Sequence, residues 1–336
     1  MKAIQFLGMT AFMAAMLTGC SNDSDLTHSN FPDDNIIRVT AGVNGAVTRA
    51  ETLGTELNNK FSLTVVNKDT ENEYNYKYTH ENKIFQKIGT GTEWICNDIL
   101  LWQDAETPVD VAALAPVTNK DWIFQGILGN QNQFQTLEYE ITADQKTQKP
   151  ENDLLYYYKS NLVPKEALNS DGKLDIQFNH AFSMIDIIVT LGTEYSNKDN
   201  PINEVIVGGS KLKATIDVTN SEGVAYPSTM GENPETNITT IPVKFNKATT
   251  DQENSTAVSS CILIPQTIGA NKFKVTLKTT SKTYVWTSPD AITLEIGHRY
   301  TLNLTMGKDK LTAQKGNISA GSWTEGTNPG STLGTK

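Results

Sequence analysis

The sequence predicts an all-β protein made of two antiparallel β-sandwich domains. Apolar and polar residues alternate along many short stretches, which places one face of each strand on a core and the other in water. Clusters of turn-forming residues separate these stretches at short intervals, a spacing that is typical of β-sandwiches. At 336 residues the chain is long enough for two domains of about 150 residues each.

Residues 1–20 have the layout of an export signal. Lys2 precedes an apolar run from Ala3 to Leu17, which is shorter than the ~20 residues of a transmembrane helix. The run ends in Leu17-Thr18-Gly19-Cys20, which resembles the lipobox of a bacterial lipoprotein signal peptide. The resemblance implies that Cys20 becomes the first mature residue and carries palmitate-type acyl chains that hold the protein on a membrane. The alternative is an ordinary secretory signal that happens to end in Cys.

Residues 21–49 are expected to form a tether followed by one strand. The stretch from Ser21 to Asp25 is polar and acidic and resembles the surface-export signal of Bacteroidales lipoproteins, although a plain solvated tether has much the same composition. A strand is predicted within residues 36–47, with these apolar residues on one face: Ile37, Val39, Ala41 and Val43. Arg49 and Ala50 follow in a loop-like stretch.

The rest of the chain divides into two expected sandwiches, residues 50–172 and residues 173–336 with a C-terminal tail. Alternation predicts strands at the following places: residues 61–65, 74–78, 212–218, 273–277 and 300–304. Residues 185–189 are more continuously apolar and suit a central strand. A weak helical pattern covers residues 164–168. Turns are predicted at these clusters: residues 169–172, 208–209, 220–223 and 288–290.

Composition and spacing argue against catalysis. The formal net charge of −10 and the pI near 5.0 leave no basic surface for nucleic acid. The four histidines are scattered without metal-ligand spacing, and we find no nucleophile elbow, phosphate loop or dinucleotide fingerprint. We therefore expect no enzyme activity, no metal and no cofactor.

Cysteines and tryptophans are expected to be structural. Beyond Cys20, only Cys96 and Cys261 remain, and two separate buried thiols are favoured over one bridge because the two residues fall in different predicted domains. A core role is also the default for four tryptophans near apolar runs, with a carbohydrate-binding platform as the alternative. These four are Trp94, Trp102, Trp122 and Trp286.

Four stretches together resemble the fimbrillin family of Bacteroidales, whose members are type V pilus subunits. They are Asp153-Leu154-Leu155-Tyr156, the Phe178-Asn179-His180 step within residues 174–187, Leu263-Ile264-Pro265-Gln266-Thr267, and the closing run of residues 294–304 followed by Ile318 and Trp323. With the lipobox, these stretches span the chain. The resemblance implies transthyretin-like Greek-key sandwiches.

Three residues in these stretches also have a physical interpretation that does not depend on the family. His180, between two strands, is expected to be a hydrogen-bonded corner residue rather than a ligand. Gly297 suits a turn that needs a positive φ angle. Trp323 is expected to close a core near the end of the chain.

The family resemblance also implies a mechanism of assembly. The precursor would reach the outer membrane as a surface lipoprotein, with its first strand filling a groove in the N-terminal sandwich. An arginine-specific surface protease would then cut between Arg49 and Ala50 and release this strand, and a strand donated by another fimbrial subunit would replace it. The product would be a stalk or tip subunit of a fimbrium that supports adhesion to a receptor on a host cell or another bacterium.

Three alternatives remain open at this stage. Residues 36–47 could be a permanent edge strand, with Arg49 an ordinary loop residue. The protein could instead be an anchor subunit that keeps its lipid, or a monomeric surface lipoprotein that binds glycans.

Overall fold

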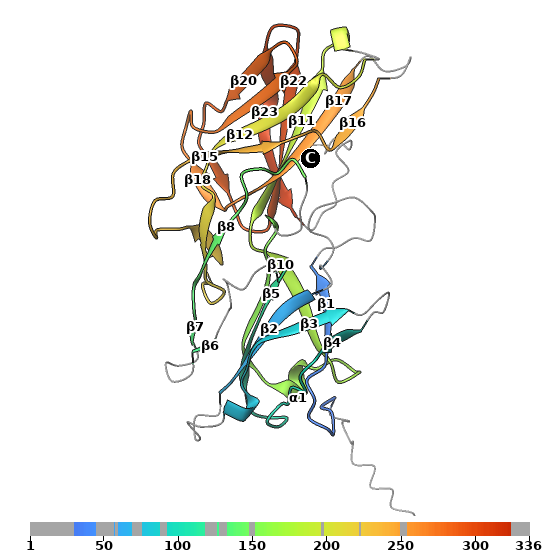
Figure 1. The fold of residues 1–336 in the computed structure, drawn as a ribbon, viewed down its shortest axis with the longest axis vertical. Helices are drawn as coiled ribbons and strands as arrows, with labels where there is room; N and C mark the ends of the chain where they lie inside the picture. Colours follow the sequence, from blue (N-terminus) through green and yellow to red (C-terminus); the bar gives the residue numbers. More distant parts are fainter. Residues whose placement is uncertain are drawn as a thin grey trace, which may run out of the picture.

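The computed structural model describes residues 30–44, 57, 60–68, 76–87, 93–117, 126–127, 133–147, 152–195, 198–221, 223–248 and 254–323. Of these residues, 56% lie in strands and 4% in helices, which confirms the all-β prediction. The strands form two parts that are stacked end to end along the long axis of the molecule (Figure 1).

The lower part in Figure 1 is built on one seven-stranded sheet. In spatial order its strands are β1 (Val39–Val43), β10 (Leu174–His180), β9 (Leu155–Leu162), β5 (Val109–Ala115), β2 (Lys60–Asn67), β3 (His80–Lys87) and β4 (Trp94–Cys96). The sheet curls until its ends meet. The Ile37 N–H donates to the Leu100 carbonyl at 2.9 Å, and the Trp102 N–H donates to the Asn35 carbonyl at 2.8 Å. The segment before β1 therefore crosses to the loop after β4.

The inside of the curled sheet holds the first hydrophobic core. Phe61 lies at its centre, with its ring centroid 5.4 Å from that of Phe85, 4.8 Å from Trp94 and 5.4 Å from Phe178. The four aromatic residues come from β2, β3, β4 and β10, so one cluster joins strands that are far apart in the sequence. Each such burial stabilises the fold by about 1.5–3 kcal/mol.

The upper part packs several smaller sheets around a second core. A five-stranded sheet has the order β16 (Lys244–Asn246), β17 (Ser255–Leu263), β11 (Ser183–Leu191), β22 (His298–Met306) and β23 (Leu311–Ser322). A four-stranded sheet has the order β15 (Thr236–Thr240), β12 (Ile202–Ser210), β19 (Lys274–Thr279) and β20 (Thr283–Thr287).

The remaining elements are short. A three-stranded sheet contains β14 (Ala225–Pro227), β13 (Lys213–Ile216) and β8 (Leu137–Glu140). Two-strand pairs join β18 (Gln266–Ile268) to β21 (Ile292–Leu294) and β6 (Gly126–Ile127) to β7 (Gln133–Phe134). The helical turns are η1 (Tyr76–Tyr78), α1 (Pro164–Ala167) and η3 (Thr193–Tyr195).

Most of the predicted elements are present where the pattern placed them, but two predictions were wrong. Residues 76–78, expected at the end of a strand, form the 3-10 turn η1, where a run of tyrosines alternated with polar residues by chance. Gly208–Gly209, expected to be a turn, lies inside β12 at a register shift, so it is a β-bulge. Gly209 has φ +92°, and a Cβ there would come within 2.5 Å of the Lys272 carbonyl oxygen.

Strand direction was predicted only in part. Most neighbouring strands are antiparallel, but β1 runs parallel to β10 and β11 runs parallel to β22. Apolar alternation is the same in both directions, so the sequence pattern carried no information on this point.

Strands β10 and β8 cross between the two parts of the molecule. β10, which lies after residue 173, pairs with β9 and β1 in the lower sheet. β8, which lies before residue 172, pairs with β13 of the upper part. The division of the chain into residues 50–172 and 173–336 stays a prediction, and each of these segments contributes a strand to the other part.

The cysteines and the described tryptophans match the predictions except at Cys96. Cys96 and Cys261 are both free thiols, but Cys96 is only partly buried. Cys261 is fully buried, and burial, with a smaller effect of the Asp186 charge, raises the pKa of its thiol far above the usual range. Trp94, Trp102 and Trp286 are buried in the cores, while Trp122 lies outside the described residues.

One side chain closes an open sheet edge in the upper part. β16 covers β17 only along Thr256–Val258. Further along β17, the Ile262 N–H donates to Oε1 of Gln145 at 2.8 Å, and Nε2 of Gln145 donates to the Ile262 carbonyl at 3.0 Å. The Gln145 amide, which is almost fully buried, therefore makes the pair of hydrogen bonds that a neighbouring strand would otherwise make.

Candidate functional site: the first strand and the junction of the two parts

The first strand lies at one edge of the lower sheet, in parallel register with β10. Val39 pairs with Leu174, and the register continues to Val43 opposite Phe178. Of the residues predicted to face one side, Ile37, Val39 and Val43 are 4%, 4% and 7% exposed, and Ala41 is half-buried against the same core. The apolar face predicted for this strand therefore packs on the core of the lower part from Ile37 to Val43, while residues 45–47 lie outside the described residues.

Polar contacts hold the outer face and the end of β1. The Thr40 hydroxyl donates to Oδ1 of Asp175 at 2.8 Å. The Asn44 N–H donates to the Phe178 carbonyl, and its side-chain amide donates to Oδ1 of Asn179, both at 2.8 Å. Both side-chain contacts are exposed to solvent, so most of the stabilisation of β1 comes from the buried face and the backbone ladder.

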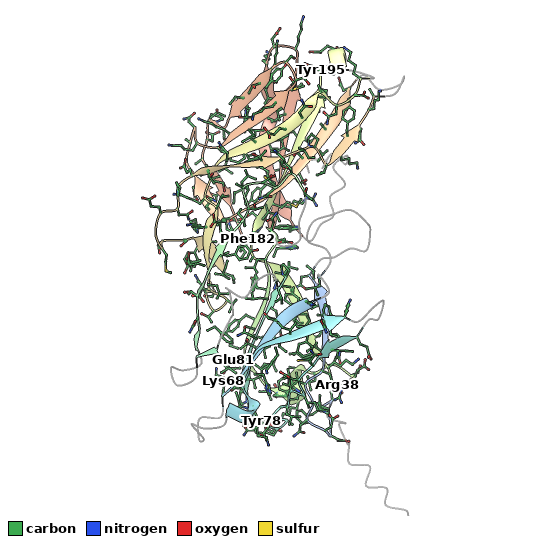
Figure 2. The ribbon with its side chains drawn as sticks, viewed as in Figure 1. Arg38, Lys68, Tyr78, Glu81, Phe182 and Tyr195 are labelled. Atoms are coloured by element: carbon green, nitrogen blue, oxygen red, sulfur yellow. The ribbon has the colours of Figure 1, made fainter. Side chains whose placement is uncertain are left out.

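Arg38 lies just before β1 and is engaged at its side chain and its backbone (Figure 2). Its guanidinium donates two hydrogen bonds to Asp34, at 2.9 and 2.6 Å, and holds the pKa of that carboxyl at about 2. The Arg38 carbonyl accepts from the Leu174 N–H at 2.8 Å. The peptide bond that follows Arg38 is therefore part of the ladder with β10.

Arg299 is held still more tightly, near the start of β22 in the upper part. Its Nε donates to Oδ2 of Asp186 at 2.5 Å, and the Ser260 hydroxyl donates to Oδ1 of the same carboxylate at 2.5 Å. The side chains of Arg299 and Asp186 are 10% and 3% exposed. Arg299 lies in β22 between Met184 and Gly321 of the neighbouring strands.

A buried stack joins the two parts of the molecule. The ring of His180 lies flat on Trp323, with 3.9 Å between centroids and 1° between planes. Its Nδ1 lies 3.0 Å from Oδ2 of Asp153, and because a carboxylate only accepts, Nδ1 carries the proton. The Trp323 N–H donates to the Gly297 carbonyl, and the Gly297 N–H donates to the Phe182 carbonyl. Figure 2 shows Phe182 between the two parts.

This junction brings together stretches that the sequence analysis singled out separately. Asp153 precedes β9, His180 ends β10, and Trp323 directly follows β23. Gly297 has φ +65°, the positive angle that was predicted for it. His180 is hydrogen-bonded and Trp323 is 5% exposed, as expected for a corner histidine and a closing tryptophan.

The other predicted site residues lie outside the described part of the chain. These are Cys20, Arg49 and Ala50. Among the described residues, no group of three or more His, Cys, Asp or Glu side chains is arranged to hold a metal ion. No helix in the described ranges has the length and hydropathy needed to cross a membrane.

Sequence reasoning missed the ion pairs at both arginines, the partner of His180 and the role of Gln145. One of these had a visible signal. Asp186 is a charged residue inside a continuously apolar strand, and such a residue needs a buried partner. The identity of that partner, Arg299, depends on a parallel strand pair that no local pattern indicates.

Comparison with known proteins agrees with this architecture. The sequence model of the fimbrillin-like family matches residues 48–323. Among solved structures, a candidate cell adhesion protein from Bacteroides ovatus is similar with a TM-score of 0.58 and 18% identity, covering 86% of this chain and 97% of that one. A fimbrial protein from Bacteroides vulgatus has a TM-score of 0.53 and 15% identity, with 86% and 99% covered. A candidate cell adhesion protein from Bacteroides uniformis has a TM-score of 0.51 and 15% identity, with 87% and 99% covered.

The chain is thus a two-part β protein that shares its fold with these three proteins. It belongs to the fimbrillin-like family, because the matched segment covers most of its length. No curated protein sequence matches it.

Proposed function

We propose that the protein is a structural subunit of a cell-surface fimbria, at the stalk or the tip, that supports adhesion. It is exported as an outer-membrane lipoprotein and assembled by protease-triggered strand exchange. The observation that carries the proposal is β1, a separate N-terminal strand that packs its apolar face on the core from an edge position. The partners are other fimbrial subunits, an arginine-specific surface protease and an adhesion receptor.

The energetics of β1 fit a strand that can be exchanged. Each of its buried apolar side chains stabilises the bound state by about 1.5–3 kcal/mol before the cost of ordering. Removal of β1 would expose the apolar core and the backbone groups of β10, which is a template for adding a new strand. A strand from a second subunit with similar alternation would restore both sets of contacts.

The distribution of arginine supports a single processing site. The full sequence has three arginines among its 28 basic residues: Arg38, Arg49 and Arg299. Arg38 and Arg299 both have their side chains paired with carboxylates and their backbones in ladders. A protease must draw several residues into an extended conformation, so both described arginines need local unfolding before they can be cut. The family match begins at residue 48, next to Arg49.

We expect an arginine-specific protease to cut the native protein once, after Arg49. The experiment is a time course of limited digestion, with the N-terminus and the mass of the large fragment determined at each point. The expected fragment begins at Ala50 and keeps an intact Arg299. The matched control is Met230→Arg, which places a new arginine in an exposed loop and should add a second cut. Early cleavage after Arg38 or Arg299 would contradict the claim that the folded structure protects these two residues from the protease.

Lipidation is tested by Cys20→Ala. A diacylglyceryl group is attached to a cysteine thiol, so this variant should lose all incorporation of labelled palmitate and should keep its signal segment. Cys96→Ala is the control, since that thiol lies in β4 and should leave labelling unchanged. Palmitate labelling that persists in Cys20→Ala would exclude the lipoprotein assignment.

The position in the fibre depends on the donor strand. The sequence places the best donor segment before Trp323, within residues 310–318. In the structure Leu311–Ser322 forms β23, an edge strand paired with β22. A stalk subunit would have to release β23, whereas a tip subunit would keep it. An anchor subunit would keep its lipid and remain uncut at Arg49, and a monomeric glycan-binding lipoprotein would not assemble at all.

A further inference from the structure

We propose that the Asp153–His180–Trp323 stack couples the two ends of the fold, so that loosening β1 loosens the end of β23 and the reverse. The proposal does not depend on proteolysis or on assembly. It rests on how β10 is held and on what its last residue touches.

Most of the backbone pairing of β10 is with β1. The ladder with β1 covers Leu174 to Phe178, whereas the ladder with β9 covers only Asn179 and His180. Among the described residues, no other strand forms a ladder with residues 175–178. Without β1, these residues keep their buried side chains but lose their backbone partners, so the strand that leads into His180 becomes less constrained.

His180 transmits this constraint to the end of the chain. The ring is 5% exposed and is fixed at its edge by Asp153 and on its face by Trp323. A shift of the ring would leave the Asp153 carboxylate, which is also buried, without its partner, and such a loss is unfavourable. The stack therefore holds His180 in one position or is lost as a unit.

Trp323 in turn fixes the end of β23. It follows directly after Ser322, which pairs with His298 of β22. The ladder between β22 and β23 is interrupted between Leu302 and Leu304, so residues 318–322 form a short ladder of their own. A five-residue edge ladder is weak alone, and its outer end is held by Trp323.

The coupling has a quantitative requirement. If loosening β1 raises the equilibrium constant for opening of the β23 end by a given factor, then loosening the Trp323 contact must raise the equilibrium constant for opening of β1 by the same factor. Coupling of this kind is typically about 5- to 150-fold in an equilibrium constant.

The test is hydrogen exchange of the uncut, soluble precursor, followed by mass spectrometry. Trp323→Ala should accelerate exchange of residues 39–44 and 174–178 at least about 5-fold. Val39→Ser, which weakens β1, should accelerate exchange of residues 318–322 by a similar factor. Trp323→Phe keeps a ring on His180 and should behave like the parent protein.

The control is Ile238→Ala. Ile238 is fully buried in β15 of the upper part, and neither β1 nor β23 pairs with that strand. The variant should accelerate exchange in β15 and its neighbour β12 and leave residues 318–322 and 39–44 unchanged. If Trp323→Ala changes only residues 318–323, or if Val39→Ser does not reach them, the coupling is wrong. If Trp323→Ala fails to fold, the exchange of residues 318–322 in Val39→Ser tests the coupling by itself.

Discussion

Cutting the soluble precursor after Arg49 should convert a monomer into oligomers. Before the cut, β1 is held at a high effective concentration by its own chain, so a strand of another subunit cannot compete for its place. After the cut β1 can dissociate, and the exposed edge of β10 then accepts a strand from a neighbour. The molar mass from light scattering should at least double after the cut, while Arg49→Ala should stay monomeric under the same protease.

A peptide covering residues 36–47 separates the outcomes of this experiment. Added in excess to the cut protein, it should occupy the groove and suppress assembly. A cut protein that stays monomeric but binds the peptide has an open groove and no donor strand, as a tip subunit would. A cut protein that begins at Ala50, stays monomeric and does not bind the peptide would exclude strand exchange.

Asp186→Ala should strongly destabilise the upper part. It removes the partner of Arg299, whose side chain is 10% exposed, and leaves a charge inside the fold. Loss of one member of a buried ion pair costs about 3–5 kcal/mol, so we expect the free energy of unfolding in urea to fall by that amount. Ser260 also loses the acceptor of its hydroxyl, which adds to the effect.

Two further variants show whether the effect belongs to the buried pair. Asp199→Ala removes a solvent-exposed partner of Lys247 and should leave the unfolding midpoint unchanged. The double variant Asp186→Leu with Arg299→Met replaces both charges by apolar side chains and should recover most of the lost stability. If Asp186→Ala unfolds at the same urea concentration as the parent, the carboxylate does not stabilise the fold.

The sequence pattern predicted what depends on local order along the chain. Alternation located β19 and β22 because each buries every second residue, and the apolar face of β1 was visible for the same reason. It also located β2, although that strand is buried on both faces from Leu63 onward. Gly297 was predicted from its place in a short turn, and its positive φ depends on its neighbours in sequence.

The pattern failed where structure depends on partners far along the chain. Nothing near Val39 indicates that it pairs in parallel with Leu174, and nothing near His180 indicates that Asp153 and Trp323 meet it. Tyr76–Tyr78 shows the opposite error, since alternation without a neighbouring strand does not make a ladder. The residues of the site could therefore be predicted from the sequence, but which of them lie together in space could not.

The Gln145 amide bears on the shape of any fibre this protein forms. A subunit that grows by adding strands produces a linear polymer only if it offers a single receptive edge. β17 has a second edge beyond its contact with β16, and one side chain satisfies the Ile262 backbone there. Two residues earlier in β17, the Thr240 hydroxyl donates to the Ser260 carbonyl, so two side chains close this stretch. If the protein assembles by exchange of β1, this stretch of β17 would not accept a second donated strand, which favours a linear fibre over a branched one.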